Sequence, residues 1–204
     1  VVEAGSHSHE VNIDLLKEPS GKQDEYIAAF GGIMCFEINK KGEVKAYPLK
    51  INYSTVSALQ NNLLMFYTGI SRSAAQILAK QKEASLREDP KMISNLRKIQ
   101  DVAYEVKEAL EKGNVTEFGK LLDKHWKIKR EREAITSPQI DKWYNVAMKN
   151  GALGGKIMGA GGGGFFAFYC EEKQDRLRKA LVKEGLEEVK FHFDFEGSKL
   201  LVNI

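Results

Sequence analysis

A run of glycines between two apolar stretches constrains the fold of this chain more than any other feature. Residues 154–168 read GGKIMGAGGGGFFAF, and the apolar residues at both ends have the pattern of short strands. Every glycine that a fold orders costs conformational entropy, so this density indicates a backbone that needs positive φ angles or close approach to a neighbour. We therefore expect a turn between two strands. Its N–H groups also suit an anion, and the residues alone leave a structural hairpin and a phosphate contact open.

The order of the elements predicts an α+β fold. From residue 63 onward we expect a strand buried on both faces at LLMFYTG, several helices, two strands flanking the glycines, a helix ended by Gly185, and a strand that alternates as far as Phe195. This is the split βαβ arrangement of ferredoxin-like domains, with helices inserted in the first crossover. Upstream, GIMCFEI and EVKAYPL predict a hairpin, and STVSALQNN predicts a short helix capped by Ser54 or Thr55.

Composition narrows the class of protein. The 204 residues are 43% hydrophobic and 29% charged, which suffices for a substantial core without disulfides or metals. The net charge of +3 is too small to indicate nucleic-acid binding. No apolar run approaches the roughly 20 residues that span a membrane. Cys35 and Cys170 lie in apolar runs and predict buried free thiols, which fits a reducing cytoplasm.

The stretch GKQDEY offers a candidate acid–base group. Asp24 lies beside Lys22 where a helix begins after a glycine. The free N–H groups and the dipole of a helix start favour a negative charge, so a carboxylate there stays ionised and can accept a proton from a hydroxyl. An ordinary acid in the first turn of a helix is the alternative.

Two further stretches offer candidate phosphate ligands. In TGISRSA, Arg72 follows Gly69 at the end of a predicted strand and is flanked by hydroxyls, with Ser71 before it. A planar guanidinium next to helix N–H groups is well suited to a phosphate, and the alternative is a capped helix with a solvated arginine. The stretch KIKRERE is mostly a solvated helix face, from which Lys129 or Arg130 can still point into a site.

These stretches together resemble the GHMP kinase superfamily. GGKIMGAGGGGFFAF is similar to its third, C-terminal glycine-rich motif, and GKQDEYIAAFGG resembles its catalytic-aspartate segment. Together with LLMFYTGISRSAAQIL, the sequences of these segments resemble one branch of the superfamily, the D-glycero-D-manno-heptose 7-phosphate kinases. The resemblance covers nearly all of the chain after about residue 9.

The resemblance implies transfer of the γ-phosphoryl group of ATP, with Mg²⁺, to the anomeric hydroxyl of a heptose 7-phosphate. It makes Asp24 the catalytic aspartate, with Lys22 beside it. It assigns the nucleotide site to a loop of six residues: Gly159, Ala160, Gly161, Gly162, Gly163 and Gly164. From its chemistry, Arg72 is our candidate for the distal phosphate of the sugar, with Gly69, Ser71, Lys129 and Arg130 as further substrate-binding candidates.

The chain departs from the family pattern near its beginning. Two motifs of the family match nothing in the sequence: the first, which lies near the N-terminus, and the second, the P-G-L-G-S-S-A type loop that wraps the ATP phosphates. The acidic Mg²⁺ ligand that accompanies the second motif is missing as well. We therefore expect residues 1–50 to be the end of an N-terminal, ribosomal-S5-like kinase domain and residues 51–204 to be the C-terminal domain, inactive by themselves. A homodimer is left open. The alternatives are a GHMP kinase for another sugar or a mevalonate-type alcohol, and a non-catalytic ferredoxin-like binding module.

Overall fold

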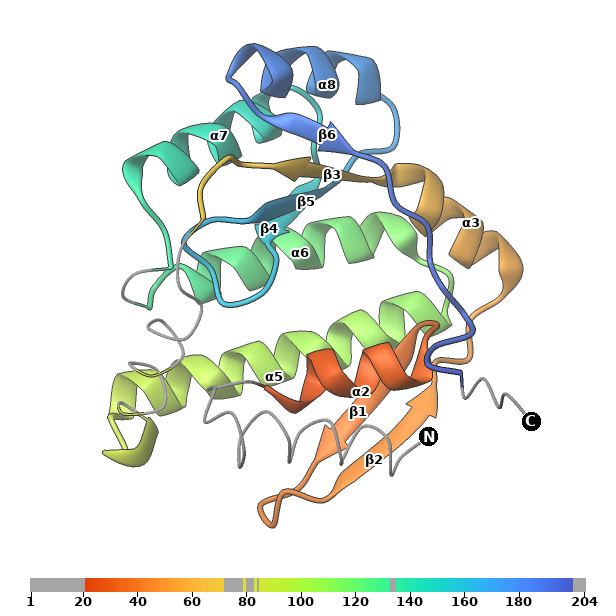
Figure 1. Cartoon of the computed structure of the whole chain (residues 1–204), viewed down its shortest axis with the longest axis vertical. Coiled ribbons are helices and arrows are strands. Elements are labelled where there is room, and N and C mark those ends of the chain that lie inside the picture. Colours follow the sequence, from red (N-terminus) through yellow and green to blue (C-terminus); the bar gives the residue numbers. More distant parts are fainter. Residues whose placement is uncertain (1–20, 72–78, 80–82, 84, 133–134, 200–204) are drawn as a thin grey trace, which may run out of the picture. The chain divides into compact units, whose positions relative to one another are not determined.

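A computed structural model describes residues 21–71, 79, 83, 85–132 and 135–199 (Figure 1). The chain divides into two compact units, one made of residues 1–50 and 192–204 and the other of residues 51–191. Each is taken by itself below. None of the helices in the described ranges combines the length and the apolar character that a membrane span requires.

The first unit contains a helix and a hairpin. Helix α2 covers Lys22–Phe30, and strands β1 (Met34–Ile38) and β2 (Val44–Pro48) pair antiparallel, as the sequence predicted. Residues 194–198 return to this unit, where the backbone of Gly197 crosses that of Gly31. A Cβ on Gly31 would lie 2.5 Å from the amide nitrogen of Gly197, so both positions require glycine.

The second unit is built on a four-stranded antiparallel sheet. Its strands are β3 (Leu63–Tyr67), β4 (Gly154–Ile157), β5 (Phe165–Tyr169) and β6 (Glu187–Val189), in the order β4-β5-β3-β6. β3 and β5, the first and third strands along the chain, are central, and β4 and β6 lie at the edges. The ferredoxin-like prediction is therefore confirmed, including the helices inserted between β3 and β4.

Five helices accompany this sheet in the described residues. They are α3 (Tyr53–Asn62), α5 (Pro90–Glu111), α6 (Val115–Lys129), α7 (Pro138–Lys149) and α8 (Gln174–Lys183). Helix α6 runs along β4, and α5 packs against α6 (Figure 1). The main core joins the sheet to α6, α7 and α8 through large buried side chains, among them Phe66, Trp126, Phe166, Phe168 and Leu181.

Several local predictions needed correction. The cap of α3 is Asn52, whose side chain accepts from the amide of Thr55, rather than Ser54 or Thr55. In β3 the side chains alternate, with Leu64 and Phe66 buried and their neighbours only half-buried, so one face is less covered than expected. Cys170 is buried as predicted, but Cys35 is only partly covered. The predicted helix after Ser71 lies largely outside the described residues.

The last strand is shorter than its alternating pattern predicted. β6 ends at Val189 and pairs with Met65 to Tyr67 of β3. Beyond Val189 the chain makes other contacts. The side-chain amide of Gln60 donates to the carbonyl oxygen of Phe191, and the backbone amide of Gly32 donates to the carbonyl oxygen of Asp194. Phe195 is 56% exposed, so the apolar alternation does not mark a sheet face there.

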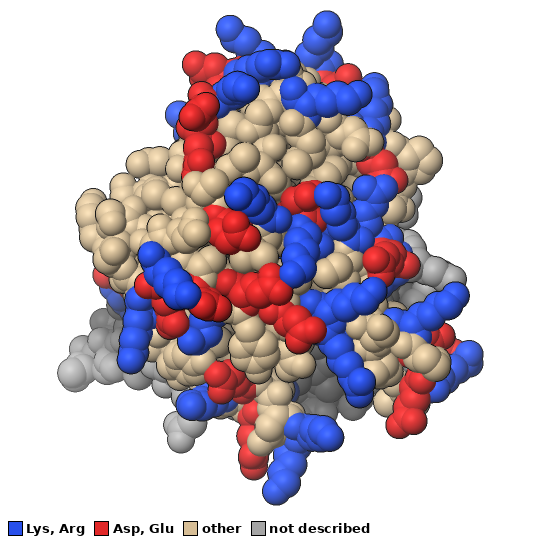
Figure 2. Space-filling view, turned by 180° about the vertical axis from the view of Figure 1, so that it is seen from behind, with Lys and Arg blue, Asp and Glu red and all other residues tan. Residues whose placement is uncertain are grey.

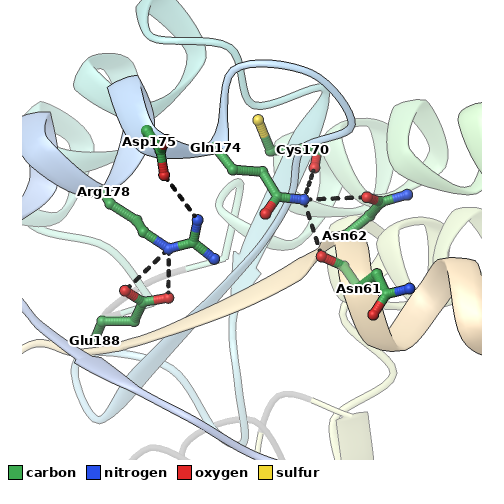
Figure 3. A network of polar contacts seen from close by, with 7 residues as sticks. All are labelled: Asn61, Asn62, Cys170, Gln174, Asp175, Arg178 and Glu188. Carbon is green, nitrogen blue, oxygen red and sulfur yellow. Dashed lines mark hydrogen bonds and ion pairs between the residues drawn. The ribbon is translucent and has the colours of Figure 1, made fainter.

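Two side chains of α8 connect it to its surroundings (Figure 3). The amide of Gln174 donates to the carbonyl oxygens of Asn61 and Cys170 and to the side chain of Asn62. The guanidinium of Arg178 bonds both carboxylate oxygens of Glu188 on β6. Through these contacts α8 is fixed to the end of α3, the end of β5 and the edge of the sheet.

Candidate active site

The glycine-rich loop, residues 158–164, connects β4 to β5 as a turn. Gly159, Gly161, Gly162 and Gly164 have φ angles between 67° and 106°, a region that other residues rarely adopt. At Gly163 the constraint is contact, because a Cβ there would lie 2.5 Å from the carbonyl oxygen of Ile70. The predicted turn is confirmed. Both expected reasons for its glycines apply, because four of them have positive φ angles and Gly163 lies close to a neighbouring backbone.

Hydrogen bonds fix this loop to two other segments. The amide of Gly164 donates to the carbonyl of Ile70 at 2.8 Å, and both the amide and the hydroxyl of Thr68 donate to the carbonyl of Gly164. The amide of Gly162 donates to the carbonyl of Ile135 at 2.9 Å. The end of the TGI segment and the glycine-rich loop, predicted from separate motifs, thus lie side by side.

The predicted substrate ligands after β3 are only partly described. Gly69 has a φ of 69° and open space where a Cβ would lie, so its backbone conformation alone requires glycine. Ser71 is exposed next to it. Arg72, the principal phosphate candidate, lies outside the described residues. The sequence analysis did not single out Thr68, although a hydroxyl directly after an apolar strand is a recognisable signal for a bond to a neighbouring loop.

Two predicted cations from the end of α6 have defined partners. The ammonium of Lys129 is buried, with 9% of the residue exposed, and donates to the carbonyl of Gly159 at 2.6 Å. The guanidinium of Arg130 pairs with Asp141 of α7 at 3.0 Å. Lys129 therefore lies at the glycine-rich loop, whereas Arg130 connects two helices.

The catalytic-aspartate segment belongs to the first unit. Asp24 is exposed in the first turn of α2, whose N-cap, Gly21, offers no side chain to the free N–H groups. Lys22 donates from Nζ to the carbonyl of Gly42 in the β1–β2 turn at 2.5 Å. The local setting of Asp24 is that of a carboxylate at a helix start, and its catalytic role stays a prediction.

Charged side chains of both signs are mixed on the face of the molecule that Figure 2 shows. Figure 2, seen from behind the view of Figure 1, has Lys and Arg interspersed with Asp and Glu. Ion pairs such as Lys124–Glu105 between α6 and α5 contribute to this mixture. A local excess of one sign therefore carries more information than the net charge of the chain.

His125 of α6 is affected by charges of one sign. Burial, together with the charges of Lys156, Lys129 and Arg132, lowers the pKa of His125 to about 3, so its imidazole is neutral at pH 7. Its Nδ1 is buried without a hydrogen-bond partner among the described residues. The sequence analysis missed Lys156 and His125, which lie on different elements and form no motif along the chain.

Candidate metal ligands were sought among the His, Cys, Asp and Glu side chains of the described ranges. Within them, no three His, Cys, Asp or Glu side chains gather closely enough to hold an ion. We therefore assign no Mg²⁺ ligand to these residues.

Comparison with known proteins agrees with the fold and the motifs. Residues 106–187 match the family model of the GHMP kinases C terminal. A D-glycero-alpha-D-manno-heptose 7-phosphate kinase of Campylobacter jejuni is 32% identical over 194 residues, 94% of this chain. A galactokinase of Pyrococcus furiosus is 23% identical over 91% of the chain.

A solved structure agrees as well. The crystal structure of a D-glycero-D-manno-heptose 1-phosphate kinase from Bacteroides thetaiotaomicron superposes with a TM-score of 0.69 at 26% identity, covering 97% of this chain and 55% of that one. The chain spans 57% of the length of the Campylobacter relative and 62% of that of the galactokinase. With its ferredoxin-like sheet and its glycine-rich loop, the chain has the fold of the GHMP kinase C-terminal domain, whose family model matches residues 106–187.

Proposed function

We propose that the protein carrying this chain transfers the γ-phosphoryl group of ATP to the anomeric hydroxyl of a heptose 7-phosphate. One observation carries the proposal: within a GHMP kinase C-terminal domain, the segment after β3 and the end of α6 both contact the glycine-rich loop. The identity of 32% to a kinase named for a heptose 7-phosphate supports this substrate class.

The proposed catalytic group is Asp24. Phosphoryl transfer depends mainly on positioning and on charge neutralisation, and the start of a helix favours a negative charge. In this role Asp24 orients the attacking hydroxyl and accepts its proton, with Lys22 adding positive charge nearby. Residues 1–50 then belong to the end of the N-terminal kinase domain.

The second unit supplies the proposed binding groups. The loop from Gly159 to Gly164 supports the nucleotide, because glycine backbone can approach a ligand closely. Arg72, Ser71 and Gly69 contact the sugar phosphate. Lys129 is a stronger candidate than Arg130 for the same phosphate, because Lys129 bonds the loop itself while Arg130 is paired with Asp141.

Further parts of the proposal concern the setting. ATP enters with Mg²⁺, and the reaction takes place in the cytoplasm with soluble substrates. We also propose that these 204 residues alone do not turn over ATP, because no stretch of them matches the loop that wraps the phosphates in this superfamily. The homodimer stays an open prediction.

The test uses the longest reading frame that contains this chain. The purified product is assayed with ATP, Mg²⁺ and D-glycero-D-manno-heptose 7-phosphate, with galactose and mevalonate as alternative acceptors. We expect turnover of the heptose phosphate and a fall in kcat of about 10²-fold or more for Asp24→Asn, because a general base contributes about that factor. Asp175→Asn, at an exposed position in α8, is the matched control.

The outcomes separate the candidates. Unchanged activity in Asp24→Asn would overturn the catalytic assignment, and preference for galactose or mevalonate would move the protein to another branch of the superfamily. Absence of turnover with every acceptor favours a non-catalytic binding module. The 204-residue chain is assayed alongside, and turnover by it would contradict its proposed inactivity.

A further inference from the structure

The pairing between β3 and β5 becomes irregular where it reaches the glycine-rich loop. Beyond the last regular pair of these strands, the amide of Thr68 donates to the carbonyl of Gly164 at 2.9 Å. A regular antiparallel pair would return the amide of Gly164 to the carbonyl of Thr68. Instead that amide donates to the carbonyl of Ile70 at 2.8 Å. Gly69, with its φ of 69°, carries the chain through this step, so the pairing ends in a bulge.

The hydroxyl of Thr68 connects the two sides of this bulge. It donates to the carbonyl of Gly164 at 2.8 Å and accepts from the amide of Ile70 at 3.3 Å. A hydroxyl has one proton to donate and lone pairs to accept with, so a single side chain serves both segments. Thr68 is 4% exposed. Because water has little access to it, loss of the hydroxyl would leave the amide of Ile70 without this acceptor.

Close packing at Gly163 adds to these bonds. A Cβ on Gly163 would lie 2.5 Å from the carbonyl oxygen of Ile70 and 3.0 Å from its Cγ2. The loop backbone therefore lies directly against Ile70. Together with the bonds of Thr68 and Gly164, this contact joins residues 68–70 to residues 163–164, and we call this joint the Thr68 interlock. A displacement of either segment must displace the other or break these contacts.

The two segments joined by the Thr68 interlock carry different proposed ligands. The loop from Gly159 to Gly164 is our candidate for the nucleotide, and Gly69 and Ser71 are candidates for the sugar phosphate. Ser71 is exposed and follows Ile70 directly. A ligand that orders one segment of such a joint also restricts the other, so the second ligand loses less conformational entropy when it binds. Positive cooperativity between the two ligands follows from this linkage.

We propose that Thr68 is a positioning residue whose hydroxyl couples the glycine-rich loop to residues 69–71, so that the nucleotide and the phosphate-bearing acceptor bind cooperatively. The inference rests on the proposed function for the identity of the two ligands, whereas the interlock itself stands on the contacts within this chain. Because Thr68 is buried, it acts through Gly164 and Ile70 rather than on a ligand.

Hydrogen exchange of the 204-residue chain tests the interlock without any substrate. In Thr68→Val the amide of Ile70 loses its acceptor, and we expect this amide and that of Gly164 to exchange at least about tenfold faster. Thr68→Ser keeps the hydroxyl and should keep the slow exchange. Thr55→Val is the matched control, because Thr55 is 3% exposed and its hydroxyl donates to Asn52 at the start of α3. Equal exchange at Ile70 and Gly164 in Thr68→Val and Thr55→Val would overturn the interlock.

Calorimetry on the product of the longest reading frame measures the cooperativity. ADP with Mg²⁺ is titrated with and without saturating D-glycero-D-manno-heptose 7-phosphate, so that both sites are filled and no transfer occurs. We expect the acceptor to lower the dissociation constant of ADP about fivefold or more, as is typical of coupled sites. In Thr68→Val this factor should fall to about one, while Thr68→Ser and Thr55→Val keep the factor of the parent protein.

The outcomes distinguish the interlock from a merely structural threonine and from the proposed function. A parent protein without coupling would overturn the cooperativity, as would a Thr68→Val variant that is less stable but keeps the parent factor. If Thr68→Val fails to fold, Gly163→Ala strains the interlock from the loop side and should lower the factor in the same way. Coupled binding of ADP and the heptose phosphate without any transfer from ATP would overturn the proposed function alone.

Discussion

The buried ammonium of Lys129 donates to the carbonyl oxygen of Gly159 at 2.6 Å. The bond connects the last turn of α6 to the first glycine of the loop between β4 and β5. There is open space where a Cβ of Gly159 would lie. The charge-assisted hydrogen bond from Lys129 restrains the backbone of Gly159.

We expect Lys129→Met to loosen the loop. The substitution keeps most of the apolar stem and leaves the Gly159 carbonyl without its ammonium donor, at a cost of about 1–3 kcal/mol. Hydrogen exchange of the amides from Gly159 to Gly164 should quicken about tenfold or more, which corresponds to about 1.4 kcal/mol. Lys127→Met is the matched control, and equal exchange rates in both variants would show that the bond does not hold the loop.

Two glycines of the GGKIMGAGGGG stretch should respond differently to alanine. At Gly154 the added methyl group would meet backbone at 2.0 Å, so α6 and β4 must separate, and we expect a loss of about 1–3 kcal/mol or more. At Gly164 there is open space but φ is 84°, so only backbone strain of about 1 kcal/mol applies. Urea unfolding of both variants measures the difference. A smaller loss at Gly154 than at Gly164 would contradict close α6–β4 packing.

Local patterns predicted those parts of the fold that neighbouring residues determine. Ser137 caps α7 and Pro138 begins it, and the preferences of serine and proline for these positions act within one turn of helix. The extent of β6 was missed because the residues after Val189 bond to Gln60 and Gly32, which are distant in the sequence, instead of continuing along β3. The same limit applies to the site: the glycine turn is local, whereas the bond from Lys129 to the carbonyl of Gly159 joins two elements that are 30 residues apart in the sequence.

Gln174 should contribute more to stability than its partly exposed position suggests. Its amide nitrogen donates to three oxygens, from Asn61, Asn62 and Cys170 (Figure 3). Since a net hydrogen bond contributes about 0.5–1.5 kcal/mol, we expect Gln174→Ala to cost about 1–2 kcal/mol in urea unfolding. Lys179→Ala, at an exposed position of the same helix, is the control. A loss no greater than that of the control would indicate that water replaces these bonds.

His125 should make the second unit sensitive to acid. Its pKa is lowered from 6.5 to about 3 in the folded chain, chiefly by burial. As the pH falls below 6.5 the unfolded chain takes up a proton that the folded chain refuses until about pH 3, so stability falls with pH across this window. One pKa unit corresponds to about 1.4 kcal/mol, which gives a loss of as much as about 2–3 kcal/mol at pH 4.5.

His125→Gln isolates this contribution from the carboxylates that titrate in the same range. Glutamine has no proton to gain, so the variant should lose less stability than the parent chain between pH 7 and pH 4.5. Urea unfolding of both proteins at the two pH values gives the difference directly. Equal losses would mean that the imidazole is hydrated well enough to charge within the fold.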